Sequence, residues 1–391
     1  MNLPQASLFA QLLDLIPRDK FELLVRQNRA EAGAKGFGCW DQFVAMLFCQ
    51  LGQAHSLREI VMGLASALGK LVHLGVRKAP KRSTLAYANE HRPWTLYRDV
   101  FNVALESAQE LAREKGRGPL RFKNPLYSLD ATLIDLCVEM FDWAKYRRTK
   151  GAVKLHLVLD HQGHLPTFAH ITEGKIHEVK MAQRLSLPPG SIVAMDRGYN
   201  DYGLFASWCE QEVFFVTRMK DNAVYEVLES LAVPENRNIR KDELILLTGS
   251  GAQEKCSHIL RRIVVWDAEN ERELVLLTNL LGFGATTIAR IYKERWKIEL
   301  FFKALKQNLR VKTFVGTSAN ALKTQIWTAL VAILLLKIVQ LKSTFGWSLS
   351  NLAALLRMNL FTYRDLWKWI NAPFETLPKP PQAGQRELGF G

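Results

Sequence analysis

Paired cysteines are missing from this sequence. None of its five cysteines stands in a C-x-x-C pair, and an odd number cannot all be paired within one chain. The pattern is typical of a reducing compartment, and it excludes both a disulfide framework and a cysteine zinc site. The cysteines are Cys39, Cys49, Cys137, Cys209 and Cys256. Five of the nine histidines fall between His156 and His177, but their spacings match no metal-ligand motif, so we expect them to be strand and loop residues.

A secretory leader and a membrane-length apolar run are also missing. The N-terminus shows no signal-peptide pattern. The most apolar run, Ile326 to Leu336, is too short to cross a bilayer, and it predicts a buried stretch of a longer apolar helix over residues 319–343. These absences favour a cytoplasmic protein without a membrane partner.

Acidic residues are in deficit. The 391 residues include 52 lysines and arginines but only 38 aspartates and glutamates, which gives a net charge of +14. Ten basic residues and two acidic ones lie between Lys293 and Lys342. Such an excess favours a polyanionic partner, nucleic acid before an anionic membrane. With 48% hydrophobic residues the chain is globular, and its length allows two or three domains.

Residues 1–120 have the pattern of a helical N-terminal domain. A capping box from Ser56 to Glu59 opens one helix, and a basic loop leads into a short helix from Ser83 that Pro93 terminates. Helix, basic turn and second helix resemble a helix-turn-helix, although many small helical domains share that pattern. In this interpretation four basic residues at the turn contact DNA phosphates. They are Arg77, Lys78, Lys81 and Arg82.

Beyond residue 120 the pattern changes to strands. We expect a strand that carries Asp130, a hairpin over residues 153–174, a helix, a buried strand that ends on Asp196, a helix, and a fifth strand near residue 216. Three antiparallel strands followed by helix, strand, helix and strand is the order of a ribonuclease H-like α/β core. The predicted core covers residues 121–220 and 286–345, the strand-rich segment 221–285 is an inserted β domain, and residues 346–391 form a C-terminal tail.

Four polar residues recur within the stretch "IYKERWKIELFFKALKQ". Tyr292, Arg295, Glu299 and Lys306 fall within about 60° of one face of a single helix, at about 100° per residue. An apolar stripe beside them would pack the helix onto a core. A solvated row of ion pairs is the simpler interpretation of one such helix on its own.

Three carboxylates are expected to meet in this core. The first and fourth strands are neighbours in the predicted sheet, so Asp130 and Asp196 lie side by side, and the closing helix brings Glu299 to both. Three carboxylates repel unless a cation joins them, and hard divalent ions such as Mg²⁺ take oxygen ligands. Taken singly, Asp130 could cap a turn and Asp196 could anchor its loop. Asp135 lies five residues beyond Asp130 and therefore on the opposite face of the strand.

The motifs "SLDAT" and "MDRGY" and the Y-x₂-R-x₃-E-x₆-K spacing resemble DDE transposases of bacterial insertion sequences, specifically the insertion-sequence family 4 group. The resemblance covers about residues 121–345. One departure is Ala131, where many relatives have serine or glycine. The resemblance implies a transposase that binds the terminal inverted repeats of its element, cleaves a strand and transfers it. A ribonuclease H-like nuclease without strand transfer, and an inactive or domesticated DNA-binding protein, are the alternatives.

The resemblance also implies roles and partners. Asp130, Asp196 and Glu299 would be the catalytic residues and would hold Mg²⁺ as two ions, with Mn²⁺ able to substitute. Double-stranded DNA, as transposon ends and target, would be the partner of a homodimer assembled on DNA in the bacterial nucleoid. Trp266 would stack on a flipped base. The residues expected to contact the DNA backbone of the ends are Tyr292, Arg295 and Lys306, with Arg218 and Lys220 as further basic candidates.

Overall fold

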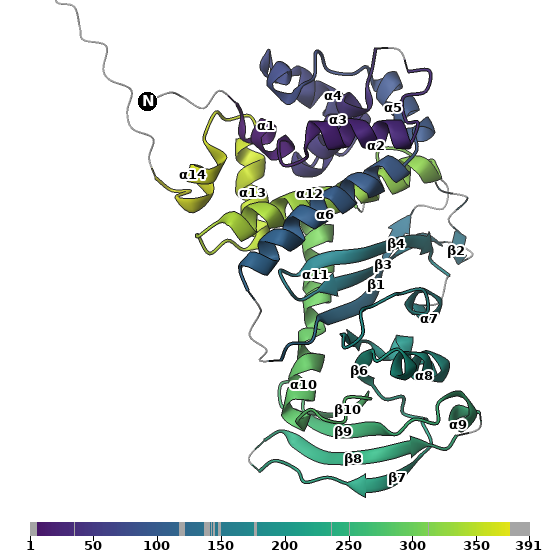
Figure 1. Ribbon diagram of the computed structural model, residues 1–391. Coiled ribbons are helices and arrows are strands. Elements are labelled where there is room, and N and C mark those ends of the chain that lie inside the picture. The colour runs from purple at the N-terminus through teal and green to yellow at the C-terminus, as the bar shows by residue number, and fades with distance from the viewer. Residues whose placement is uncertain are drawn as a thin grey trace, which may run out of the picture.

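The computed structural model describes residues 6–34, 36–116, 122–136, 141, 143, 145–147, 150–175, 178–235, 237–249, 251–311 and 313–375. Helices gather at one end of the molecule and a large twisted sheet occupies the other (Figure 1). The sheet carries the predicted carboxylates, so its order and its two faces decide the geometry of the site.

Within the described residues the strands form one ten-stranded sheet, with the order β2-β3-β1-β5-β6-β10-β9-β8-β7 and β4 paired to β3. Its first part comprises β1 (Leu126–Leu136), β2 (Lys145–Arg147), β3 (Lys150–Asp160), β4 (Leu165–Glu173), β5 (Ile192–Met195) and β6 (Phe214–Arg218). β3 pairs antiparallel with both β1 and β4, whereas β1 pairs with β5, and β5 with β6, in parallel. The predicted order of the strands is therefore confirmed. The predicted first and fourth strands, which are β1 and β5, are neighbours in the sheet, as expected.

Both faces of this sheet are apolar, which is why its central strands are continuous hydrophobic runs. Leu126, Ile192 and Val216 face helix α10 (Ala285–Glu294) in one cluster. Leu129, Val193 and Phe215 alternate with them and form a cluster with α8 (Tyr202–Glu210) on the other face. The short α7 (Glu178–Ala182) belongs to this second layer.

The segment predicted as an inserted β domain continues the same sheet. It contains β7 (Tyr225–Ser230), β8 (Ile239–Leu247), α9 (Ala252–Lys255), β9 (Leu260–Asp267) and β10 (Arg272–Thr278). β10 pairs antiparallel with β6. A buried ion pair of 2.6 Å between Arg261 and Asp242 holds β9 to β8, and Arg261 also donates to the carbonyls of Leu281 and Phe283. These bonds fix the return of the chain to α10.

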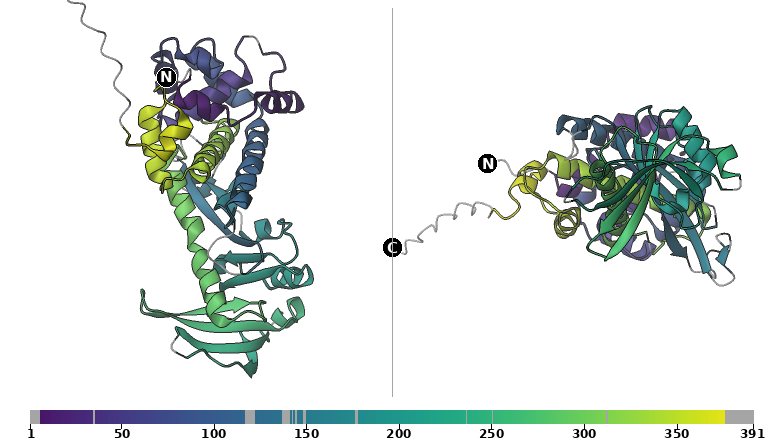
Figure 2. Two further views of the ribbon diagram at one scale, coloured as in Figure 1. Left: turned by 60° about the vertical axis from the view of Figure 1, so that its left-hand side comes forward. Right: turned by 90° about the horizontal axis from the view of Figure 1, so that it is seen from below.

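The predicted single helix that closes the core is two helices. α10 ends at Glu294 and α11 (Trp296–Asn308) begins at Trp296, and the two follow one another along the side of the sheet (Figures 1 and 2). The expectation of one continuous helix is wrong because the backbone tightens at the junction. Arg295 donates its N–H to the carbonyl of Tyr292 at 3.1 Å, and Ile298 donates to Arg295 at 3.2 Å, so both bonds span three residues instead of four.

The helical end has one shared core. Helix α12 packs against α3, α5, α6 and α13, and it carries the predicted long apolar run. Its length and composition would suffice to cross a membrane, but 83% of its most apolar window is buried inside the protein. The helices of this end are α1 (Leu8–Leu13), α2 (Arg18–Gln27), α3 (Cys39–Leu51), α4 (Leu57–Ala65), η1 (Lys70–Leu74), α5 (Arg82–His91), α6 (Thr95–Glu114), α12 (Ala319–Lys342), α13 (Leu349–Asn359) and α14 (Leu366–Asn371).

One expectation for this end is refined and one needs correction. The segment predicted as a C-terminal tail, residues 346–391, begins with α13 and α14, and Leu352, Leu356 and Ile370 of these helices are buried in the common core. Residues 376–391 of that tail lie outside the described residues. The connector between α4 and α5 covers residues 66–81 and includes η1, which is much longer than the turn of about three or four residues in a helix-turn-helix.

Candidate active site

Asp130 and Asp196 lie side by side on one face of the sheet. The parallel register pairs Leu129 with Met195, and an aspartate follows each of them: Asp130 within β1, and Asp196 directly after the end of β5. Leu129 and Met195, which directly precede the two aspartates, lie on the face covered by α8. Successive side chains of a strand point to opposite faces, so Asp130 and Asp196 lie on the face covered by α10 and α11. The Asp130 carboxylate accepts the N–H of Ala131 at 2.8 Å. Asp196 precedes the short helix η3 (Arg197–Tyr199).

Arg295 joins the third carboxylate to the first. Its Nη2 lies 2.7 Å from Glu299 Oε1, and its Nη1 lies 3.7 Å from Asp130 Oδ2. The junction between α10 and α11 thus aims one guanidinium at acids on two different elements. Only 13% of the Arg295 side chain is exposed, so this contact is far better shielded from water than a surface ion pair.

The carboxylates influence one another electrostatically. Burial raises the pKa of Asp130 to about 6, the Ala131 N–H and Arg295 oppose the rise, and the charges of Asp196 and Glu299 add to it. All three acids are therefore close enough to repel. Their donor set, oxygen only, suits hard divalent ions such as Mg²⁺ and Mn²⁺. Among the described residues, the oxygens of these three carboxylates do not all lie within 4.8 Å of one another. Arg295, which contacts Asp130 and Glu299, supplies part of the positive charge that the acids require.

The loop after Asp196 is tied to the end of β6. Asn200 donates to the Arg218 carbonyl at 2.7 Å and accepts from the Thr217 hydroxyl at 2.9 Å, while the Lys220 ammonium donates to the Asn200 carbonyl at 3.0 Å. These bonds hold the "DRGYN" turn next to the strand that carries Arg218. The alternation of β6 places Arg218 on the same face as Asp196.

Tyr292 and Lys306 occupy different surroundings. Tyr292 is 9% exposed. Burial raises the pKa of its hydroxyl, and Arg295, Asp196 and Arg218 act on it electrostatically, so it belongs to the carboxylate site. Lys306 donates its ammonium to the Leu133 carbonyl of β1 at 2.8 Å, which anchors α11 across that strand.

Trp266 lies on the part of β9 that reaches past the end of β6. β10 pairs with β6 through Leu276 to Thr278, and its remaining residues continue beyond Arg218 and pair with Trp266 and Asp267. The turn after β9 returns toward the site, because Glu269 lies 3.6 Å from Lys293 near the end of α10. Trp266 is half-buried, outside the three hydrophobic clusters, and the Arg240 guanidinium lies 5.7 Å from its ring centre.

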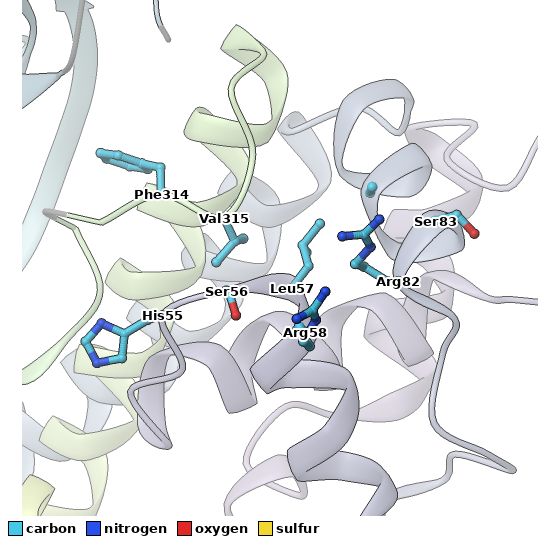
Figure 3. A pocket seen from close by; sticks show the side chains of 9 residues that line it. His55, Ser56, Leu57, Arg58, Arg82, Ser83, Phe314 and Val315 are labelled. Atoms are coloured by element: carbon cyan, nitrogen blue, oxygen red, sulfur yellow. The ribbon is translucent and has the colours of Figure 1, made fainter.

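The basic residues predicted near the turn of the N-terminal region are all exposed, namely Arg77, Lys78, Lys81 and Arg82. Arg82 also lines a hollow of about 510 Å³ between the first turns of α4 and α5 and residues 314–315. Arg58 enters the same hollow from α4 (Figure 3). Sequence analysis did not single out Arg58: the capping box places it in the first turn of α4, but no local pattern indicates that it lies near Arg82.

The hollow is electrically unbalanced. Within the described residues neither the Arg58 nor the Arg82 guanidinium has a hydrogen-bond or ion-pair partner. Lys81, the N-cap of α5, makes no side-chain capping bond, so the first N–H groups of α5 remain available to an anion. Two guanidinium groups beside a helix start fit a phosphate group in size and charge.

Comparisons with known proteins identify the family to which the chain is similar. Residues 121–335, more than half of the chain, match the family model described as transposase DDE domain. Residues 4–77 match a second model, a domain of unknown function. The y4zB protein of Sinorhizobium fredii, named as a transposase, is 29% identical over 74% of this chain and 80% of its own. A Synechocystis protein named as a transposase for insertion sequence element IS4SA is 25% identical over 68% of this chain and 73% of its own.

Among solved structures, a piggyBac transposase synaptic complex with hairpin DNA covers 94% of this chain and 82% of that one, with 10% identity and a TM-score of 0.44. At this TM-score and identity, the similarity gives no information about the site residues.

Proposed function

The chain belongs to the transposase DDE domain family, and on that premise we propose that Asp130, Asp196 and Glu299 are the carboxylates with which it cleaves and joins DNA. It is the DDE-type transposase of a bacterial insertion sequence. The observation that carries the proposal is the Arg295 guanidinium between Asp130 and Glu299, beside the register that pairs the Asp130 and Asp196 strands. A metal ion that binds the carboxylates could take the place of the Arg295 guanidinium as their positively charged partner.

We propose that the three carboxylates bind Mg²⁺, or Mn²⁺ in its place, as two ions. Held by these three residues, such ions would supply Lewis-acid chemistry, which would activate a water and stabilise the leaving oxygen of a phosphodiester. Arg295 then leaves Glu299 and becomes free to contact a DNA phosphate, as expected from its place on the polar face. The same guanidinium thus neutralises carboxylates in the free protein and phosphate in the complex.

Further backbone contacts would come from Tyr292 and Arg218 beside the carboxylates, from Lys220 on the loop after β6, and from Lys306. Lys306 donates to the Leu133 carbonyl, so its contribution to DNA binding requires either that this hydrogen bond breaks or that the lysine acts through the position of α11.

The N-terminal helices would hold the DNA end at a distance from the carboxylates, with Arg77, Lys78, Lys81 and Arg82 on its phosphates and Arg58 beside them. We propose residues 1–120 as this recognition unit, residues 121–220 and 286–345 as the ribonuclease H-like core, and residues 221–285 as its β insertion.

We further propose that two copies assemble on the paired ends as a homodimer, in the nucleoid of a bacterial cytoplasm. The net charge of +14 favours assembly on DNA over association of free chains, because like charges repel. Gel filtration of the free chain and of its complex with end DNA tests this proposal. A complex that contains one chain would contradict it.

Cleavage of a duplex that carries the inverted repeats flanking the gene tests the catalytic assignment. Asp130→Asn, Asp196→Asn and Glu299→Gln should each reduce cleavage in Mg²⁺ by at least about 1,000-fold, because each removes one anionic ligand, while binding to the same duplex persists. Asp135→Asn is the matched control, since Asp135 is exposed on the opposite face of the same strand. Wild-type cleavage by any of the three variants would remove that residue from the site.

Supplying a precut 3′-hydroxyl end distinguishes a nuclease from a transposase, since only a transposase joins that end to target DNA.

Trp266 is proposed to receive a flipped base near the cleaved strand. Stacking on an aromatic face is worth about 1–3 kcal/mol per base, so Trp266→Ala should slow the second-strand step by about tenfold or more and leave the first nick unchanged. Trp266→Phe should restore most of that step. Equal slowing of both steps, together with lower thermal stability, would instead make Trp266 a packing residue.

A further inference from the structure

A second group of metal-ligand side chains lies apart from the three carboxylates. His161 and His164 stand on the turn between β3 and β4, and Glu294 is the last residue of α10. One ligand atom from each lies within 4.8 Å of the others, and among the described residues this is the only group of three or more His, Cys, Asp or Glu side chains to do so. All three residues are partly buried.

The first imidazole is oriented by a hydrogen bond. His161 Nε2 lies 2.7 Å from the Ser128 hydroxyl, which leaves Nδ1 directed toward Glu294 Oε2, 3.8 Å away. A second hydrogen bond on the far nitrogen is the usual means by which a protein fixes the tautomer and direction of a metal-binding histidine. Ser128 lies two residues before Asp130 and is itself buried.

The second imidazole is placed by a constrained turn. His164 has a φ of 53°, a conformation that side chains other than glycine seldom adopt, and Gly163 before it has a φ of 82°. A Cβ on Gly163 would lie 2.8 Å from the Ala112 side chain of α6, so this turn is held tightly against that helix. The unusual conformation is therefore maintained by packing and not by the local sequence alone.

Both imidazoles are neutral at physiological pH. Burial lowers the pKa of His161 to about 3 and that of His164 to about 4, with contributions from Lys297 to both and from Lys337 to His164. Neutral imidazole is the form that binds a metal. The positive charges of Lys297 and Lys337 disfavour the binding of a cation at these histidines, and the negative charge of Glu294 favours it. Removing the charge of Lys337 is therefore one way to test the site.

We propose that His161, His164 and Glu294 bind one transition-metal ion of the Zn²⁺ type through two imidazole nitrogens and one carboxylate oxygen. This donor set favours Zn²⁺, Co²⁺ or Ni²⁺ over Mg²⁺, which prefers oxygen ligands alone. The ion joins the β3–β4 turn to the end of α10, one residue before Arg295. Its occupancy holds the junction from which Arg295 reaches Asp130 and Glu299. The site is independent of the proposed catalytic role of those carboxylates.

Metal titration of the full chain tests the proposal. The measurement is Zn²⁺ binding by competition with a chromophoric chelator, in millimolar Mg²⁺ to occupy oxygen-only sites, with Co²⁺ absorption as a second readout. The wild type should bind one equivalent of Zn²⁺ and show the visible bands of nitrogen-ligated Co²⁺. His161→Ala, His164→Ala and Glu294→Gln should each weaken binding by at least about tenfold. His170→Ala, which removes a partly buried histidine from the same hairpin, is the matched control and should bind as the wild type does.

A second variant keeps the test decisive if the histidine variants do not fold. Lys337→Met approximately preserves the length of the side chain and removes a positive charge that acts on His164, so it should lower the Kd for Zn²⁺ severalfold. A Kd that is unchanged or higher in Lys337→Met would overturn the proposal. Wild-type Zn²⁺ binding by His161→Ala and His164→Ala would overturn it as well.

Discussion

The carboxylate site and the hollow between α4 and α5 balance charge in opposite ways. At the carboxylate site three acids lie close together, and the partly buried Arg295 guanidinium contacts two of them, Asp130 and Glu299. In the hollow, Arg58 and Arg82 line the same space and have no acidic partner among the described residues. The first site has anions in excess and requires cations, and the second has cations in excess and requires anions.

This difference separates two tasks that a DNA-cutting enzyme must perform. A site with excess carboxylate binds metal ions and repels phosphate until those ions are present, whereas a site with excess arginine attracts phosphate at once. We therefore propose that the arginines of the hollow contribute to binding of the end, whereas the three carboxylates are required for its cleavage. Variants that change one charge at a time should separate the two activities.

Arg295→Met should give the largest change. It leaves Asp130 and Glu299 without their shared counter-charge, so the free energy of unfolding without Mg²⁺ should fall by about 3 kcal/mol, the low end for a broken buried pair because Glu299 is 34% exposed. Millimolar Mg²⁺ should recover part of the loss by replacing the missing charge. Urea denaturation with and without Mg²⁺ measures both values. A loss that Mg²⁺ does not reduce would mean that Arg295 serves packing alone.

Asp130→Asn should stabilise the metal-free protein. The folded pKa of about 6 exceeds the ordinary value of 3.8, so the ionised carboxylate destabilises the fold above pH 6 and the cost disappears as the pH falls toward 3.8. The variant should gain at most about 3 kcal/mol at pH 8, since each pKa unit corresponds to about 1.4 kcal/mol, and almost nothing at pH 4. Thermal denaturation across that pH range measures the difference. A constant difference at all pH values would show that the effect is not electrostatic.

Arg58→Ala and Arg82→Ala should give the smallest change, in DNA affinity and not in stability. Each should weaken binding to the end duplex about fivefold and lower the slope of log affinity against log salt by about 0.9, since one phosphate contact is lost. Arg26→Ala, an exposed arginine of α2 away from the hollow, is the control. Fluorescence anisotropy at several salt concentrations gives the slopes. Slopes equal to that of the control would remove the hollow from the DNA interface.

Local patterns predicted the elements that carry the carboxylates. Alternation of apolar residues placed Asp130 and Asp196 on strands, and the strand order made those strands neighbours, as the register between Leu129 and Met195 confirms. The helical spacing brought Glu299 and Arg295 together one turn apart, as their 2.7 Å contact confirms. These features depend on short-range periodicity, which a sequence shows directly.

Features that depend on distant contacts were not predicted. The break between α10 and α11 occurs where Arg295 reaches across to a strand more than 160 positions earlier in the chain. The extension of the main sheet by residues 221–285 depends on the pairing of β10 with β6. The folding of α13 and α14 depends on a core that they share with the N-terminal helices. Periodicity within a segment identifies an apolar face, but it does not identify what covers that face.

The position of the ions in a crystal grown with Mn²⁺ would show whether the three carboxylates form one metal site, because anomalous scattering locates Mn²⁺ without reference to activity. We expect Mn²⁺ to be bound by carboxylate oxygens of Asp130, Asp196 and Glu299, with the Arg295 guanidinium moved away from Glu299. Mn²⁺ located only elsewhere, with Arg295 still joining Asp130 to Glu299, would contradict this expectation.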